Sequence, residues 1–546
     1  MGFLTMLQRV SAAWTDDRAW GRADAQQVHD ALGDLLGAPA PGDLPGTEAL
    51  DAAAAQAAAR WDPQRGGLDR TPKFPADLPL EALILQHQRT GDPEPLRIVT
   101  TTLHAMASGG IRDQLGGGFH RYALDPDWRV PHFEQMLYDN AQLAVVYLDA
   151  AAAADDPALA DVARGVLQWL DQRFSAPDGA FYAAFDADGP VPGAPDRHEE
   201  GRPYTWTPAE IRAALPPDLA ELAITAWDVR DDGPVDGRNT LALHGPAPFG
   251  LDAARKQLLA VRDALPQPAR DDKVVTAWNG LAVSAFARAA LALQEPTRAE
   301  RAARAADAVW AGAWHDGQLS RTAARTSDGV LEDYADLAAG LVDLFEATAE
   351  PRWLQRALLL DAVVQARFTA EDGGLWRTAG DPTLPRERPD HDGPEPSGAS
   401  VHARTLYRLA ALTGDDAYRA RGDAILRSLA GRIGALPAML PAVDWRADDP
   451  VEVVVVAPTG ADASAWAAAI QRGPRHRVQL VVEADQVDAV AAVAPVVAGK
   501  VARDGQITGY VCHQGACRAP ATTLAAFAAA LAPTEFAPLR DKAGSH

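Results

Sequence analysis

Apolar residues recur at helical spacing through most of the chain. Segments such as "DVARGVLQWLDQRF" and "ALLLDAVVQARF" place Leu, Val and Ala three and four positions apart, which predicts amphipathic helices. A glycine-containing turn follows each such segment: "RGGLDR", "GGGFHRY", "DGAFYAAFD", "DGQLSR" and "DGGLWR". The turns lie about 50 to 60 residues apart, with one longer gap that has room for further copies. Two helices and a loop fit that period.

Five or six helical hairpins of this kind cannot each bury an apolar face alone, so they must pack together. An open solenoid and a closed ring both satisfy this need. The loops after alternate helices are long and rich in aromatic residues, which favours a ring that gathers them at one end. We therefore predict a mainly α protein with an (α/α)6 toroid, of the six-hairpin glycosidase type, over residues 47–445.

The pattern changes after residue 445. "PVEVVVVAPTG", "RVQLVVEA" and "GQITGYVC" predict buried strands, and helical segments follow each of them. That alternation predicts a small, mostly parallel α/β domain over residues 446–546. Its first loop, "PTG", lacks the glycines and lysine of a phosphate-binding loop.

The N-terminal segment, residues 1–46, predicts helices followed by the linker "GAPAPGDLPG". No secretory signal or membrane-length apolar run is visible, and the two cysteines, Cys512 and Cys517, are too few for a disulfide framework, although they could remain a thiol pair or form one disulfide. A cytoplasmic location is the simplest expectation.

Composition narrows the possible partners. The 546 residues include 74 acidic and 51 basic side chains, for a net charge of −23. This excess of negative charge argues against binding to nucleic acid or to an anionic membrane.

The densest functional chemistry lies in "GGIRDQLGGGFHRYALDPDWRVPHFEQMLYDN". A sugar site needs aromatic faces together with Arg, Asp and hydroxyl groups, and acid/base chemistry at a sugar carbon needs His and carboxyl groups. We take Pro131 to open a helix, which would put His132 and Asp139 on one face, seven residues apart. The candidate ligand-binding residues here are Asp113, His120, Arg121, Tyr122, Trp128 and Tyr138. A purely structural role, capping and cross-linking hairpins, is about equally probable for any single one of them.

Four further patches are candidates for the same cavity. They supply Asp186 and Asp188, then Glu200, Tyr204 and Trp206, then Trp278 and Asn279, and finally Glu332, Asp333 and Tyr334. Most of these groups stand at the start of a predicted helix, where the helix dipole favours bound anions. The two aspartates of "FDADG" could equally form a turn.

No zinc-binding or nucleophile-elbow motif is present, and "CHQGAC" is a poor metal site. We therefore expect neither a metal nor a cofactor.

The motifs "GGLDRTPKFP", "GGGFHRYALDPDWRVPHFEQMLYDNAQL", "RPYTWTPAEI", "DDKVVTAWNGLAVSA" and "YVCHQGACRAP" resemble those of the spermatogenesis-associated, thioredoxin-like protein family. The resemblance covers roughly residues 60 to 530. It implies a toroid similar to those of N-acylglucosamine 2-epimerase and the six-hairpin glycosidases. In that family a thioredoxin-like domain precedes the toroid, and this sequence lacks it.

The sequence thus predicts a carbohydrate-active protein with a sugar as its small-molecule ligand. Epimerisation or isomerisation is slightly preferred, with His132 as acid or base, Glu134 as its partner and Asp139 orienting it. Glycoside hydrolysis would instead use two carboxyl groups, Asp333 with Glu134 or Asp186. A non-catalytic binding or scaffold protein, and a redox or protein-quality role, are the alternatives.

Overall fold

The computed structural model describes residues 2–36, 41–380, 384–473, 476–513 and 516–532. Twelve helices in these ranges form a double ring. The inner helices are α4 (Leu80–Thr90), α6 (Leu137–Ala154), α11 (Thr276–Ala292), α13 (Leu331–Thr348), α15 (Gly398–Thr413) and α17 (Leu440–Ala447). The outer helices are α3 (Glu48–Arg60), α5 (Pro93–Ser108), α7 (Pro157–Arg173), α12 (Pro296–Ala313), α14 (Pro351–Arg367) and α16 (Asp416–Ser428).

The inner helices close the ring. Each packs against the next in chain order, and α17 packs back against α4. Helices α11 and α13 pack very closely at Gly280. A Cβ atom added to this glycine would lie only 2.5 Å from the backbone of Asp336. The predicted (α/α)6 toroid is therefore confirmed.

Glycine turns connect the outer helices to the inner ones, as the repeat predicts. Gly117, Gly179, Gly317 and Gly373 follow four outer helices, and all four have φ between 76° and 103°. Because an L side chain is strained at these angles, glycine is the residue that allows the turn. The connections between the helices also contain short strands: β1 (Tyr122–Ala123), β2 (Pro131–His132), β3 (Gln135–Met136), β4 (Ala184–Phe185), β7 (Arg270–Asp271), β8 (Trp314–His315) and β9 (Gln318–Leu319).

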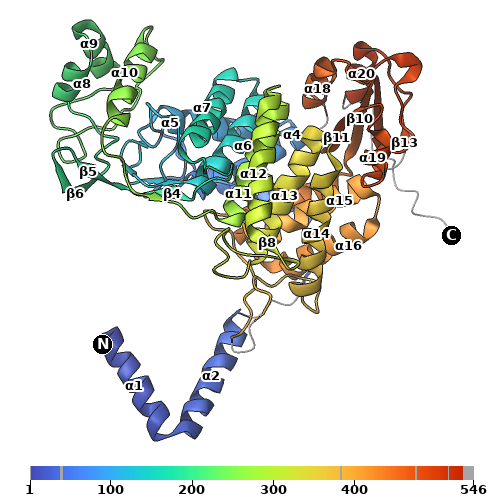
Figure 1. Cartoon of the computed structure of the whole chain (residues 1–546), viewed down its shortest axis with the longest axis horizontal. Helices are drawn as coiled ribbons and strands as arrows, with labels where there is room; N and C mark the ends of the chain where they lie inside the picture. The colour runs from blue at the N-terminus through green and yellow to red at the C-terminus, as the bar shows by residue number, and fades with distance from the viewer. Residues whose placement is uncertain (1, 37–40, 381–383, 474–475, 514–515, 533–546) are drawn as a thin grey trace.

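An insertion between α7 and α11 fills the long gap between glycine turns. It contains β5 (Asp188–Val191), β6 (Ala194–Glu200), α8 (Pro208–Ala214), α9 (Pro217–Ala226) and α10 (Leu251–Asp263). Its helices surround a separate apolar core that includes Ile211, Trp227 and Leu258. In Figure 1 these green helices and the red C-terminal sheet stand on opposite sides of the ring.

The C-terminal sheet has the strand order β11-β10-β12-β13. Its elements are β10 (Val451–Ala457), α18 (Ser464–Gln471), β11 (Arg477–Glu483), α19 (Val487–Ala491), β12 (Thr508–His513), β13 (Ala516–Cys517) and α20 (Leu524–Leu531). The expected α/β domain is confirmed, but the mostly parallel arrangement is wrong. Only β10 and β11 run parallel among the described strands, whereas β12 is antiparallel to β10. The chain returns from β11 through α19 and short 3-10 turns, and it enters β12 from the opposite end of the sheet.

This sheet covers one end of the ring. Strand β11 packs against α13, and Arg477 lies close enough to Glu346, near the end of α13, to interact with it electrostatically. The opposite end of the ring, where α6, α11, α13 and α15 begin, is called the mouth below.

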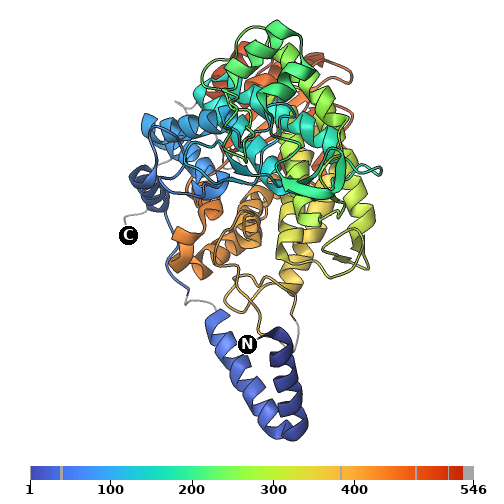
Figure 2. The same ribbon diagram turned by 90° about the vertical axis from the view of Figure 1, so that its left-hand side faces the viewer.

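The N-terminal helices α1 (Phe3–Asp16) and α2 (Arg18–Leu36) project away from the ring in both views (Figures 1 and 2). Their apolar side chains, such as Phe3, Leu4 and Val10, are exposed. Among the described residues, no helix is long and apolar enough to span a membrane.

Candidate functional site

The start of α6 differs from the prediction made from its sequence. Residues 131–132 form β2, which pairs with β1, and residues 135–136 form β3, which pairs with β4. The helix begins only at Leu137. His132 and Asp139 are therefore not on one helical face, and the prediction that Asp139 orients His132 is wrong.

Two glutamates hold His132 instead. Its Nδ1 lies 2.7 Å from Oε1 of Glu200 on β6, and its Nε2 lies 3.2 Å from Oε2 of Glu134. Arg121 donates to the same Oε2 of Glu134 at 2.9 Å. Tyr122 stacks on the imidazole with ring centroids 5.0 Å apart. The insertion thus reaches over the mouth through Glu200 and contacts the residues that begin α6.

Asp139 lies in the first turn of α6 and is 6% exposed. Burial raises the pKa of its carboxyl group well above the usual value; Arg121 opposes this effect, and Glu395 and Glu134 add to it. Among the described residues, its Oδ2 has no hydrogen-bond partner. Burial without a partner for this oxygen therefore favours the protonated form of the Asp139 carboxyl group.

Trp278, on α11, packs against Tyr138, the residue before Asp139. Its ring meets that of Tyr138 edge-on, with centroids 4.9 Å apart, and its Nε1 donates to Oε2 of Glu395 at 2.6 Å. Burial raises the pKa of Glu395, against the opposing hydrogen bond from Trp278. Glu395 belongs to the loop before α15, so two inner helices and one loop contribute to one group of side chains.

The start of α13 adds three carboxyl groups. Asp333 caps the helix and is fully buried: it accepts from the backbone N–H of Val330 and Ala277 and from Arg321. Burial raises its pKa to about 7, against the effect of these donors. Its oxygens are occupied by structural partners, which leaves the other two groups, Glu332 and Asp336, as the ones available to a ligand.

Asp336 is the most isolated carboxyl group at the mouth. It is 1% exposed, and neither of its oxygens has a hydrogen-bond partner among the described residues. Burial raises its pKa well above the usual value, and Glu395, Glu332 and Asp333 raise it further.

Several predicted ligand-binding residues have structural roles instead. Asn279 accepts from the N–H of Phe181 and donates to its carbonyl, which fixes the glycine turn after α7. Asn140 does the same for Phe119. The Tyr334 hydroxyl accepts from the N–H of Leu319.

Other predicted residues lie apart from the mouth cluster. Asp113 forms a buried ion pair with Arg262 of the insertion at 2.7 Å. His120 is also buried there; it contacts the carbonyl of Phe133 through Nδ1, and burial lowers its pKa to about 4. Trp128 is buried and donates to the carbonyl of Arg65.

The aspartates of "FDADG" form a turn. Asp186 accepts from the N–H of Asp188, and both side chains are exposed. Among the described residues, neither aspartate forms a hydrogen bond or ion pair with Glu134 or Asp139, so the structure supports the turn rather than a catalytic pair.

Sequence reasoning missed Glu395, Asp336, Arg321 and Arg377. Asp336 follows Glu332 by four residues, so the two share one face of an otherwise apolar helix. That spacing in the sequence indicates that Asp336 lies beside Glu332 and could belong to the same site. Glu395 lies between two prolines in an irregular loop, where no periodicity indicates its direction.

Curated proteins of similar sequence settle the family. Human spermatogenesis-associated protein 20 is 31% identical over 96% of this chain, and the match spans 74% of the human protein. The rat protein of the same name is 32% identical over 81% of this chain and 63% of its own length. The chain belongs to the spermatogenesis-associated protein 20 family. The predicted resemblance is thus confirmed, although no family model matches the sequence.

Solved structures with a related shape come from other families. Cellobiose 2-epimerase from Bacillus thermoamylovorans is 9% identical with a TM-score of 0.44, covering 67% of this chain and 81% of its own. An alpha-mannanase from Bacteroides thetaiotaomicron is 9% identical with a TM-score of 0.45, covering 73% of this chain and 94% of its own. Likeness at this level says nothing about the chemistry of the spermatogenesis-associated protein 20 family.

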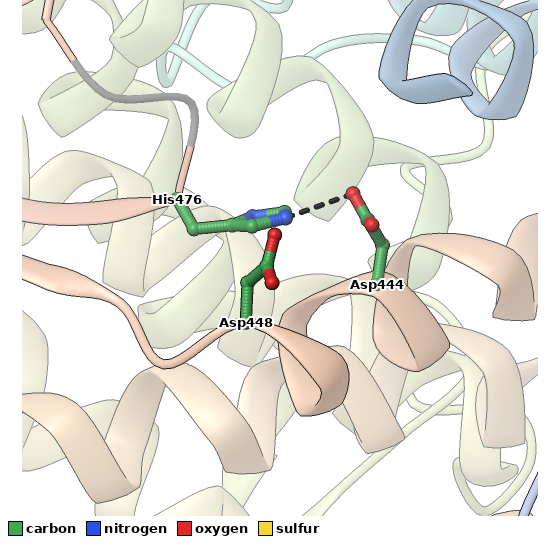
Figure 3. A group of neighbouring side chains, drawn as sticks. All are labelled: Asp444, Asp448 and His476. Atoms are coloured by element: carbon green, nitrogen blue, oxygen red, sulfur yellow. Dashed lines mark hydrogen bonds and ion pairs between the residues drawn. The ribbon is translucent and has the colours of Figure 1, made fainter. Parts of the chain in front are cut away.

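A second group of ionisable side chains in this family member lies away from the mouth. Figure 3 shows His476 between Asp444 and Asp448, which are separated by four residues at the end of α17. One ligand atom from each of the three lies within 4.8 Å of the others, a spacing found in metal sites. Nε2 of His476 is 2.8 Å from Oδ2 of Asp444, and both residues are buried. We assign this ion pair a structural role, because it ties the last inner helix to the start of β11.

Proposed function

We propose that the chain is a carbohydrate-active enzyme that cleaves glycosidic bonds at the mouth of the ring. The observation that carries this proposal is the pair Asp139 and Glu134. Asp139 is a buried carboxyl group with an unpartnered oxygen, whereas Glu134 is contacted by the cationic group of Arg121 and by His132. Glycosidases use such a pair, one carboxylic acid and one carboxylate in different environments.

The two carboxyl groups take complementary roles. Asp139 donates its proton to the glycosidic oxygen as the bond between that oxygen and the anomeric carbon breaks. The Glu134 carboxylate attacks the anomeric carbon, or takes a proton from the water that attacks it. Trp278 and Tyr138 supply aromatic surface for the sugar ring.

Epimerisation, which the sequence slightly favoured, becomes the second candidate. A base must have a ring nitrogen free to accept a proton, but both nitrogens of His132 face carboxylate oxygens. Neither ring nitrogen of His132 is therefore free to take a proton from a sugar carbon.

The test is a product screen with the full chain. Incubation with a panel of oligosaccharides and aryl glycosides, analysed by mass spectrometry and carbohydrate NMR, is expected to give new reducing ends. Unchanged chain length with inverted stereochemistry at one carbon would favour the epimerase instead. Binding of a sugar without any product would favour the non-catalytic binding or scaffold protein instead.

A matched pair of substitutions assigns the acid. Asp139→Asn removes the donated proton and is expected to lower turnover by about 10²- to 10⁴-fold. Asp155→Asn makes the same chemical change at the exposed end of α6 and should leave turnover unchanged. Equal turnover in the two variants would exclude Asp139 as the acid.

A further inference from the structure

The α13 side of the mouth holds carboxyl groups that the proposed cleavage does not use. Asp336 is 1% exposed and has no partner at either oxygen among the described residues. Glu332 is 7% exposed, and its Oε2 likewise has none. Both lie close enough to Glu395 for an electrostatic interaction. We call Glu332, Asp336 and Glu395 the acidic pocket.

The nearby arginines offset the negative charge of this pocket only in part: Arg321 acts on Asp336 and Glu395 from a distance, and none of the described arginines pairs directly with Asp336. Arg321 donates to Asp333 at 3.1 Å and lies 29% exposed beside it. Arg377 is shared between Glu332, at 3.4 Å, and Glu387, at 3.3 Å. Asp336 therefore has no direct cationic partner, although burying a carboxyl group without one is costly.

An aromatic ring adjoins the acidic pocket. Trp278 donates to Glu395, and its ring packs against Tyr138. Carboxylates beside an indole ring are the groups that recognise a protonated amine, through ion pairs and through cation–π attraction. An anionic sugar would find Arg321 and Arg377 already engaged by Asp333, Glu332 and Glu387.

We propose that the acidic pocket binds the protonated amino group of an amino sugar, with Asp336 as the residue that selects it. This inference rests on the proposed function, because it names the substrate class of the same site. An ammonium group next to Asp336 supplies the missing positive charge. The Asp336 carboxyl group then releases its proton to the solvent, so that the bound pair is a carboxylate and an ammonium ion.

Calorimetric titration of the full chain at pH 6 tests the proposal without any turnover. The probes are D-glucosamine, 6-amino-6-deoxy-D-glucose and, as the neutral isostere, D-glucose. At least one amine should bind ten-fold or more tightly than glucose. Its apparent binding enthalpy should also differ between two buffers of unequal ionisation enthalpy, because a proton is released.

Two variants locate the effect. Asp336→Asn should weaken binding of the amine at least ten-fold and remove the buffer dependence. Asp328→Asn removes an exposed carboxylate from the loop before α13 and should change neither. Glucose binding as tightly as both amines, or amine binding that is the same in Asp336→Asn as in the unmodified chain, overturns the inference.

The inference and the proposed function fail in different ways. Amine binding with proton release, but no cleavage of any glycoside, upholds the pocket and removes the hydrolase. Cleavage of neutral glycosides with no preference for an amine upholds the hydrolase and overturns the amine-binding pocket.

Discussion

Replacing Asp336 by Asn is expected to stabilise the protein, and the gain should grow with pH. The substitution breaks no hydrogen bond among the described residues, because both oxygens of Asp336 lack partners. Burial raises the pKa of this carboxyl group well above the ordinary value of 3.8. The unfolded chain therefore loses the proton first as pH rises, and each pH unit between the two pKa values costs about 1.4 kcal/mol of stability. Asn does not ionise, so the variant avoids this cost.

The expected shift in Tm depends on the entropy of unfolding, which grows with the length of the chain. Across each pH unit between the two pKa values the difference in free energy of unfolding grows by about 1.4 kcal/mol. Unfolding of all 546 residues as one unit has an entropy of roughly 1.1 kcal/mol per kelvin. The difference in Tm between Asp336→Asn and the unmodified chain should thus widen by about 1 °C per pH unit in this window, and by more if the ring melts separately.

The matched control is Asp343→Asn, which makes the same change seven residues further along α13. Burial works against ionisation of Asp343, but Arg408 and Arg288 outweigh it and lower its pKa. The stability that Asp343 contributes is present above pH 3.8 and is lost as pH falls through its folded pKa. This variant should therefore be less stable at neutral pH, with a difference that shrinks in acid.

Differential scanning fluorimetry at constant ionic strength measures both variants from pH 3 to 7. The reasoning is refuted if the Asp336→Asn difference stays flat or narrows as pH rises. It is also refuted if both variants shift in the same direction at neutral pH.

Three further substitutions test the structural assignments. Asp113→Ala leaves Arg262 buried without its partner and should cost about 3–5 kcal/mol in urea unfolding. Asn279→Ala leaves the backbone groups of Phe181 unpaired and should cost about 1–3 kcal/mol for each buried group, by the same assay. Cys512 and Cys517 form a disulfide across β12 and β13, and replacing both by Ser should cost about 2 kcal/mol, as expected for so short a loop, without changing sugar turnover. A redox role would instead require turnover to depend on this pair.

The double ring was predictable because its signals are local. An apolar stripe and a glycine turn recur within each hairpin, and the turn at Gly179 or Gly373 needs no distant partner to be recognised. Closure of the ring followed from the number of hairpins and the length of their loops. The same local logic predicted that polar residues at the starts of α6, α11 and α13 would face one end.

The details of the mouth depend on contacts that are distant in sequence. The chain around His132 is extended because it pairs with Tyr122 and because Gln135 pairs with Phe185, and neither partner can be read from a helical pattern. The partner of His132 is Glu200, in a hairpin of the insertion. The antiparallel direction of β12 is likewise set by the path of the chain after β11.

Helices α6 and α13 each carry one aspartate that is paired with an arginine and one aspartate with an oxygen unpartnered within the described part of the chain. On α6, Asp149 is bound by Arg288 at 2.7 Å, and on α13, Asp343 is bound by Arg408 at 2.7 Å. At the mouth, Asp139 and Asp336 occupy the same helices, yet each has an unpartnered oxygen among the described residues. A ring that only needed to be stable would pair the mouth groups as it pairs the deeper ones, because unpaired burial is costly. Among the described residues, the buried carboxyl oxygens without a partner belong to Asp139, Glu332 and Asp336, at the end where three helices present aromatic and carboxyl groups together, and there a ligand can supply the missing partner.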